Sequence, residues 1–121
     1  MKMRLAVLTS SVSASARSFL DGHQLTPFFE VIVTGGEIER GKPDPDVYLR
    51  AVEKLDVSPE ASLVIEDSLA GVAGGKAAGT QVSAIPDGRF ADAREYNKQG
   101  DYVFGSVLEI AYCFAIMRSS Y

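Results

Sequence analysis

The sequence predicts a single α/β domain in which helices cover both faces of a mainly parallel sheet. Short runs rich in Leu, Val and Ile alternate with helical segments along the 121 residues, and the connections between them are short. Such alternation is typical of parallel strands joined by right-handed helical crossovers. A content of 46% hydrophobic and 23% charged residues fits one domain with a modest core over residues 1–121.

The strands are predicted from short apolar and β-branched runs that end at glycine, proline or polar residues. In chain order these runs are residues 5–8, 29–33, 63–65, 81–85 and 102–104. The first and third are continuously apolar, as expected of strands that are buried on both faces. The last is short and predicts an edge strand.

The helices are predicted in the segments between these runs. In chain order they are residues 13–20, 46–55, 68–78, a short polar helix within 89–99, and a terminal helix over about 106–118. Gly22 and Gly79 stand where the first and third helices should stop. Pro43 and Pro45 suit the start of the second helix, because N–H groups need no partner there, and Asp44 is the expected cap. The apolar terminal segment is too short to span a bilayer, which takes about 20 residues.

Composition excludes several classes of partner. The net charge of −4 argues against nucleic acid, because binding it requires clustered Lys and Arg. Residues 1–16 imitate a secretory signal peptide, but their apolar stretch is short and a buried strand explains it better. We expect no membrane partner. The single cysteine, Cys113, rules out an internal disulfide and fits a reducing compartment, so a cytoplasmic location is expected.

Polar residues follow several of the predicted strands. Glu66 and Asp67 end the third strand, and adjacent carboxylates are costly unless a cation or hydrogen-bond donors neutralise them; capping of the next helix is the alternative. Thr9 and Ser10 end the first strand, and the loop with Lys42 should reach the same edge of the sheet. Singly, the hydroxyls are typical helix caps and the lysine a typical surface residue. Together they predict a phosphate site with Mg²⁺.

Three segments resemble the second, third and fourth motifs of the haloacid dehalogenase-like superfamily, in its branch of phosphatases and phosphomutases related to β-phosphoglucomutase. The segments are residues 5–10, 41–48 and 63–71. The resemblance implies that Thr9 and Ser10 bind the transferring phosphoryl group and that Lys42 steadies it. It also implies that Glu66 and Asp67 hold Mg²⁺. The implied fold is a Rossmann-like three-layer α/β/α core.

Two parts of the family pattern, the nucleophile strand and the helical cap domain, are not found in this sequence. Family members begin with a strand ending in Asp-x-Asp, whose first aspartate attacks phosphorus, and they carry a helical cap domain. The only Asp-x-Asp here, residues 44–46, opens a helix and is not expected to be catalytic. The resemblance therefore implies a partial core whose central strand would lie between residues 5–8 and 63–65. Exposed edges there predict self-association, strand exchange with another chain, or a rearranged sheet.

The function implied by the resemblance is that of the C-terminal part of a Mg²⁺-dependent hydrolase. Such an enzyme is a phosphatase or phosphomutase that acts on a small phosphorylated metabolite through an aspartyl-phosphate. Without the nucleophile, this chain alone is expected to be inactive and to bind Mg²⁺ weakly or not at all. The alternative is a non-catalytic remnant that binds a partner or a phosphate.

Overall fold

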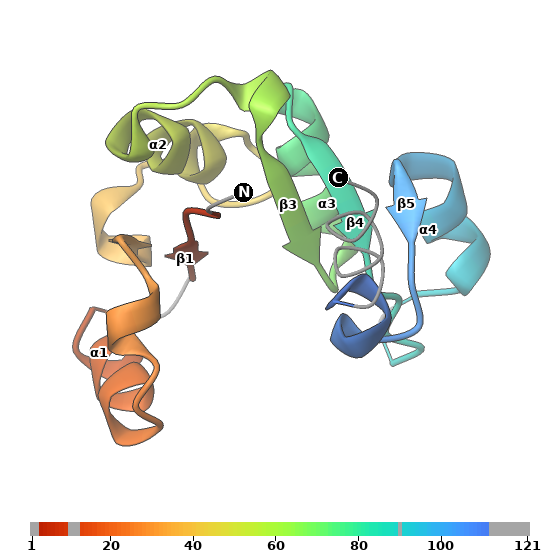
Figure 1. Cartoon of the computed structure of the whole chain (residues 1–121). Coiled ribbons are helices and arrows are strands. Elements are labelled where there is room, and N and C mark those ends of the chain that lie inside the picture. Colours follow the sequence, from red (N-terminus) through yellow and green to blue (C-terminus); the bar gives the residue numbers. More distant parts are fainter. Residues whose placement is uncertain (1–2, 10–12, 90, 112–121) are drawn as a thin grey trace, which may run out of the picture.

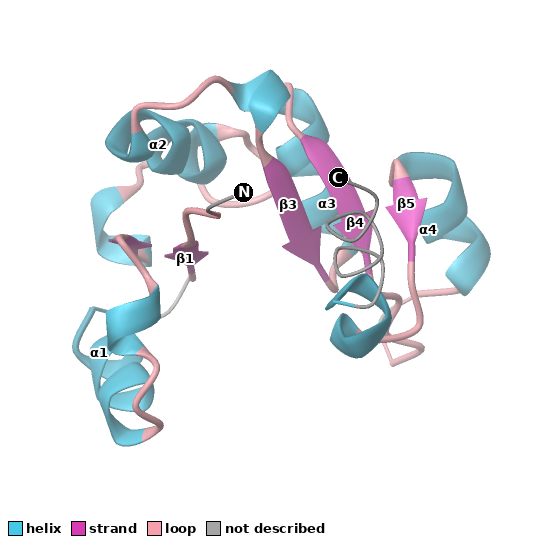
Figure 2. Ribbon diagram, viewed as in Figure 1, coloured by secondary structure: helices cyan, strands magenta, loops and turns pink. Residues whose placement is uncertain are grey.

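The computed structural model describes residues 3–9, 13–89 and 91–111, in which strands and helices alternate (Figure 1; Figure 2). The strands are β1 Ala6–Leu8, β2 Val31–Val33, β3 Leu63–Glu66, β4 Gln81–Ala84 and β5 Tyr102–Val103. The helices are α1 Ser13–Gly22, α2 Asp46–Leu55, α3 Leu69–Ala77 and α4 Ala93–Gln99, with 3₁₀ turns η1 Thr26–Phe28, η2 Gly35–Glu37 and η3 Pro59–Ala61. The α/β prediction is confirmed.

The predicted terminal helix is only partly within the described residues. Residues 107–111 are helical and Ile110 is 3% exposed, whereas residues 112–118 lie outside the described part. Among the described residues, no helix is long and apolar enough to cross a membrane.

The strands form two separate parallel sheets. β1 pairs with β2, and β3, β4 and β5 form the second sheet in that order. Within the described residues β1 and β3 do not pair with each other, so the centre of the predicted sheet is open (Figure 1). The expected alternative of a rearranged sheet, in which these two strands close the gap, is therefore wrong for this structure. Each strand is already fixed on its other side by a parallel neighbour and by helices packed on it.

Helices α2, α3 and α4 lie next to one another along the two sheets. α2 contacts β1 and β2, α3 contacts β3 and β4, and each helix contacts the next. The buried residues of α2 are Val47, Tyr48, Ala51 and Leu55, a spacing that places them on one face of a helix. This face packs against Val33 of β2. This packing of α2 places the preceding loop, which contains Lys42, at the edge of the gap between β1 and β3.

The start of α2 differs in detail from the sequence prediction. Pro45, not Asp44, occupies the N-cap position, with φ −75° and ψ −5°. The Asp44 carboxylate instead accepts a hydrogen bond from the backbone N–H of Asp46, at 3.1 Å. An aspartate commonly bonds the backbone two residues on, and this local turn explains the shift in the cap. At the end of α3, Gly79 has φ +85°, which confirms it as the residue that stops the helix.

Helix α3 approaches its neighbours closely because of its glycines. A Cβ on Gly74 would lie 2.7 Å from Cε2 of Tyr48, and one on Gly75 would lie 2.8 Å from Cγ2 of Val82. Glycine in a helix costs roughly 0.5–1 kcal/mol relative to alanine. That cost is offset here by close packing, which sets the position of α3 against both α2 and β4.

Candidate functional site

A cleft of about 670 Å³ separates the two sheets. It is lined by all of β1 and β3 and by residues of α2 that include Tyr48. Several of the apolar side chains on these two strands and beside them are exposed: Leu5 is 41%, Leu63 36% and Ile65 47% exposed. The opening in the sheet is therefore a groove with apolar walls.

In β3, the backbone N–H and C=O groups of every second residue point into this cleft. The carbonyls of Ser62 and Glu66 accept hydrogen bonds from the β4 side of the sheet, at 3.1 Å and 2.8 Å. Backbone groups of successive residues in a strand point to opposite sides, so Leu63 and Ile65 direct theirs away from β4. These two residues present donors and acceptors to the cleft.

The backbone of β1 has the same arrangement on the other wall. Leu5 and Thr9 bond to the β2 side, the first through its carbonyl at 2.9 Å and the second through its N–H at 3.0 Å. Ala6 and Leu8 therefore direct their backbone groups away from β2, toward the cleft. In the part of the chain that the structure describes, two strand edges without a pairing strand thus face the same space.

The Glu66 carboxylate, at the end of β3, accepts two short hydrogen bonds at one oxygen and a longer one, 3.5 Å, from the Ser68 hydroxyl at the other. Its Oε1 accepts hydrogen bonds from Lys42 Nζ at 2.6 Å and from the Tyr48 hydroxyl at 2.6 Å. The side chains of Glu66 and Lys42 are 9% and 25% exposed, and the ammonium also lies 5.7 Å from the centre of the Tyr48 ring. The structure therefore brings together two of the residues singled out in the sequence, and their opposite charges compensate each other.

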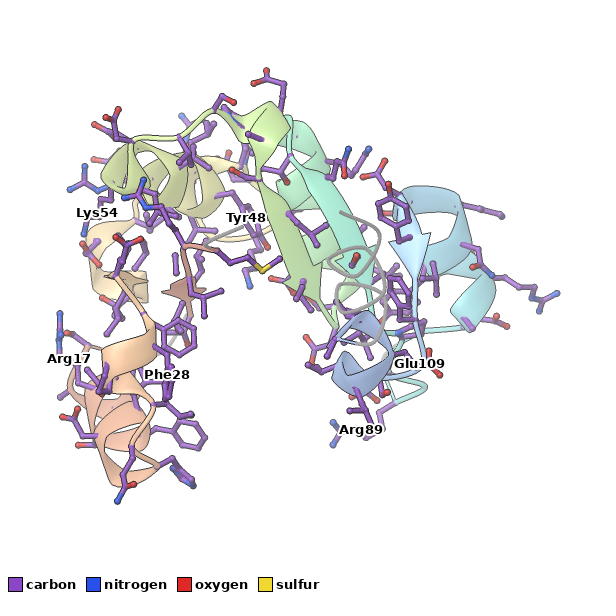
Figure 3. All side chains as sticks on the ribbon, in the orientation of Figure 1. Arg17, Phe28, Tyr48, Lys54, Arg89 and Glu109 are labelled. Atoms are coloured by element: carbon purple, nitrogen blue, oxygen red, sulfur yellow. The ribbon has the colours of Figure 1, made fainter. Side chains whose placement is uncertain are left out.

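Tyr48 was not among the residues that the motifs single out for chemistry. It is buried in the core from α2, and Figure 3 shows it between α2 and β3. Burial raises the pKa of Tyr48 well above its ordinary value of 10, and the hydrogen bond to Glu66 raises this pKa further. The hydroxyl is therefore a donor at neutral pH. The sequence did contain one indication of this contact, because a tyrosine on the buried face of a helix usually needs a hydrogen-bond partner for its hydroxyl.

Asp67 occupies a different environment from its neighbour. It is exposed, and its backbone carbonyl accepts a hydrogen bond from the Tyr96 hydroxyl at 2.8 Å. The helix that follows is capped by Ser68, whose side chain accepts from the N–H of Gly71 at 3.0 Å. The alternative interpretation of Glu66 and Asp67 as the cap of α3 is therefore wrong: the serine is the residue whose extended backbone places its hydroxyl over the first turn.

The remaining predicted residues lie at the end of β1. Thr9 follows directly after Leu8, which lines the cleft. Ser10 lies outside the described residues. The roles of Thr9, Ser10 and Lys42 in binding phosphate remain predictions.

The donor set of this site fits only part of a metal centre. Mg²⁺ prefers about six oxygen ligands in octahedral geometry. In the described part of the chain, no group of three or more His, Cys, Asp or Glu side chains could hold a metal ion. Glu66 and Asp67 can contribute at most two carboxylates, and the first already bonds Lys42. The remaining ligands would be water molecules, substrate oxygens or groups of another segment.

Comparison with known proteins identifies the family. A family model of haloacid dehalogenase-like hydrolases matches residues 1–85. The chain belongs to this family of hydrolases. It is 38% identical over 93 residues to a phosphorylated carbohydrates phosphatase of Thermotoga maritima, with 73% of this chain and 43% of the relative covered. The resemblance that the three motifs carry is thereby confirmed.

Solved structures agree with the family and the fold. A candidate β-phosphoglucomutase of Thermotoga maritima superimposes with a TM-score of 0.76 and 32% identity, covering 84% of this chain and 48% of that one. The CbbY protein of Rhodobacter sphaeroides in complex with phosphate gives 0.75 and 31%, covering 86% and 47%. This haloacid dehalogenase-like chain thus spans less than half the length of each of these relatives.

Proposed function

We propose that this chain supplies the phosphate-positioning and acidic motifs of a phosphoryl-transfer site that acts on a small phosphorylated metabolite. The observation that carries the proposal is the contact between Lys42 and Glu66 at the edge of the cleft, from two separate motifs of the family. The relatives support it, because one is a phosphatase of phosphorylated carbohydrates and another was solved with phosphate. Whether the enzyme is a phosphatase or a phosphomutase depends on whether water or a second substrate hydroxyl accepts the phosphoryl group.

In this proposal each residue has a distinct role. Thr9 and Ser10 donate hydrogen bonds to the phosphoryl oxygens, and Lys42 holds the same group through its charge. Asp67 is an exposed carboxylate that can bind Mg²⁺ directly, with Glu66 beside it. The metal supplies positive charge that neutralises the phosphoryl oxygens. The chain's own residues provide orientation and charge, and none of them is the nucleophile.

The nucleophile enters on a strand that fills the cleft between β1 and β3. That strand carries Asp-x-Asp and comes from outside these 121 residues, either from a longer form of the chain or from a second polypeptide. Its first aspartate attacks phosphorus, and the substrate oxygen leaves with a proton from the second. Water then hydrolyses the aspartyl-phosphate and releases phosphate. Without this strand the chain turns over no substrate, binds Mg²⁺ weakly, and self-associates or exchanges strands through the open edges.

An assay with p-nitrophenyl phosphate and Mg²⁺ tests the proposal. The chain alone should show no turnover, whereas addition of an apolar segment ending in Asp-x-Asp should restore it. Asp67→Ala should abolish the restored activity, and Asp92→Ala, which changes an exposed aspartate outside the site, should leave it intact. Turnover by the chain alone that disappears in Asp67→Ala would overturn the requirement for the strand.

A non-catalytic remnant is the second candidate. It is favoured by the ion pair of Lys42 and Glu66, because the lysine already neutralises the charge of that carboxylate without a metal. Absence of turnover with and without the added segment would support this candidate. In either case we propose a cytoplasmic location, because the single cysteine fits a reducing compartment.

A further inference from the structure

The Glu66 carboxylate is fixed from two directions. On one side, Lys42 Nζ and the Tyr48 hydroxyl both donate to Oε1 at 2.6 Å. On the other side, a Cβ on Gly71 would lie 2.1 Å from Oε2 and 2.6 Å from Oε1, so only glycine leaves room for the carboxylate. The Ser68 hydroxyl lies 3.5 Å from Oε2 on this same side. The carboxylate therefore has one position, bounded by donors and by the α3 backbone.

The Tyr48 hydroxyl is the part of this arrangement that carries no charge. Its ring is almost fully buried between α2 and α3, with 2% of the residue exposed, so the hydroxyl has a fixed direction. Lys42 is more exposed and more flexible, and it reaches the same oxygen. Without the hydroxyl, Oε1 would keep only the flexible donor, and the carboxylate could rotate with it.

We infer that Tyr48 is a positioning residue that fixes the Glu66 carboxylate and, through it, the Lys42 ammonium. One N–H of that ammonium is used by Glu66, and two remain for phosphoryl oxygens. The inference rests on the proposed function for its consequence in catalysis, but the geometry it describes is independent of substrate and metal. Gly71 contributes to the same positioning, because the carboxylate occupies the space that a side chain at this position would fill.

The first test reads the positions of the two charged groups without any activity. The full chain is labelled with ¹³C at the glutamate carboxyls and at the lysine ε-carbons, and the signals of Glu66 and Lys42 are assigned by their loss in Glu66→Gln and Lys42→Met. Tyr48→Phe keeps the ring and should shift both signals. Tyr102→Phe, which changes a tyrosine that is 49% exposed, should shift neither.

A second variant reaches the same carboxylate from the other side. Gly71→Ala leaves Tyr48 unchanged but places a methyl group where the carboxylate lies, so it should also shift both signals. Because the clash is with the end of the Glu66 side chain and not with backbone, the carboxylate should be displaced while the helix keeps its fold. Gly36→Ala is the matched control, since a Cβ there meets nothing within 4 Å. Unchanged Glu66 and Lys42 signals in folded Tyr48→Phe or in folded Gly71→Ala would overturn the inference.

The unaltered protein offers a measurement that does not depend on the folding of any variant. A carboxylate that accepts a tyrosine hydroxyl should change its ¹³C shift between H₂O and D₂O by a different amount from exposed glutamates such as Glu53, which is 72% exposed and open to water. No difference between them would overturn the inference.

Activity then separates this inference from the proposed function. In the complemented enzyme, Tyr48→Phe should lower kcat on the order of tenfold with little change in KM, the size expected for one hydrogen bond to a charged group. Shifted signals without any phosphatase activity would leave the positioning role standing and refute the proposed function. Full activity in Tyr48→Phe, with unshifted signals, would refute the positioning role alone.

Discussion

The contact between Lys42 and Glu66 should make a measurable contribution to the free energy of unfolding. The carboxylate is 9% exposed and the lysine side chain 25% exposed. Removing one partner of a fully buried pair costs about 3–5 kcal/mol, and this pair keeps partial solvent access and a second donor from Tyr48. We therefore expect Lys42→Met to lower the free energy of unfolding by about 2 kcal/mol.

A double-mutant cycle isolates the interaction itself. Lys42→Met, Glu66→Gln and the double variant are unfolded in urea at one protein concentration, and the coupling free energy is taken from the four values. We expect about 1–2 kcal/mol, because a charge-assisted bond at 2.6 Å in a partly buried site is only weakly screened.

An exposed pair in the same protein provides the control. Arg94 and Asp92 form an ion pair at 2.9 Å, with side chains that are 84% and 53% exposed. The cycle of Arg94→Met and Asp92→Asn should give less than about 0.5 kcal/mol. Equal coupling free energies in the two cycles would show that burial does not strengthen the contact between Lys42 and Glu66, contrary to this prediction.

Two further predictions concern the surrounding fold. Gly74→Ala should destabilise the chain by about 1–3 kcal/mol in urea unfolding, because its Cβ would lie 2.7 Å from the Tyr48 ring. Gly22→Ala is the control, since a Cβ there meets nothing within 4 Å. Equal free energies of unfolding for the two variants would contradict the close packing of α3. The Glu37 carboxylate accepts one hydrogen bond from Lys54 and one from the backbone N–H of Thr34, which lower its pKa from 4.5 to about 2. Its stabilising contribution should be present above pH 4.5 and disappear as the pH falls toward 2, so the difference in urea midpoint between the wild type and Glu37→Gln should shrink over that range. A difference independent of pH would contradict this assignment.

Local signals in the sequence predicted much of the fold. The helix expected over residues 46–55 is observed at Asp46–Leu55, because Pro43 and Pro45 mark its start and the apolar spacing defines its buried face. The second strand is shorter than expected, Val31–Val33 instead of residues 29–33. The N–H of Phe29 closes the 3₁₀ turn Thr26–Phe28 by donating to the Thr26 carbonyl, so the strand begins later.

Tertiary contacts were less accessible to sequence reasoning. The bond from Tyr48 to Glu66 joins residues 18 positions apart and depends on how closely α2, α3 and β3 pack. No local pattern in the sequence marks the roles of the glycines of α3, yet Gly71 and Gly74 each leave space for a side chain of another element. Motif spacing places Lys42 at the correct edge of the sheet, but only the structure shows that its partner is Glu66.

We expect the cleft between β1 and β3 to receive a strand that completes the site. Binding of the Asp-x-Asp segment in the cleft can be followed by amide hydrogen exchange with and without that segment. The N–H groups of Leu63, Ile65, Ala6 and Leu8, which face the cleft, should become protected, whereas Val64, which faces β4, should change little. Restored phosphatase activity without protection of Leu63 and Ile65 would contradict this expectation, because the segment would then act from somewhere other than the cleft.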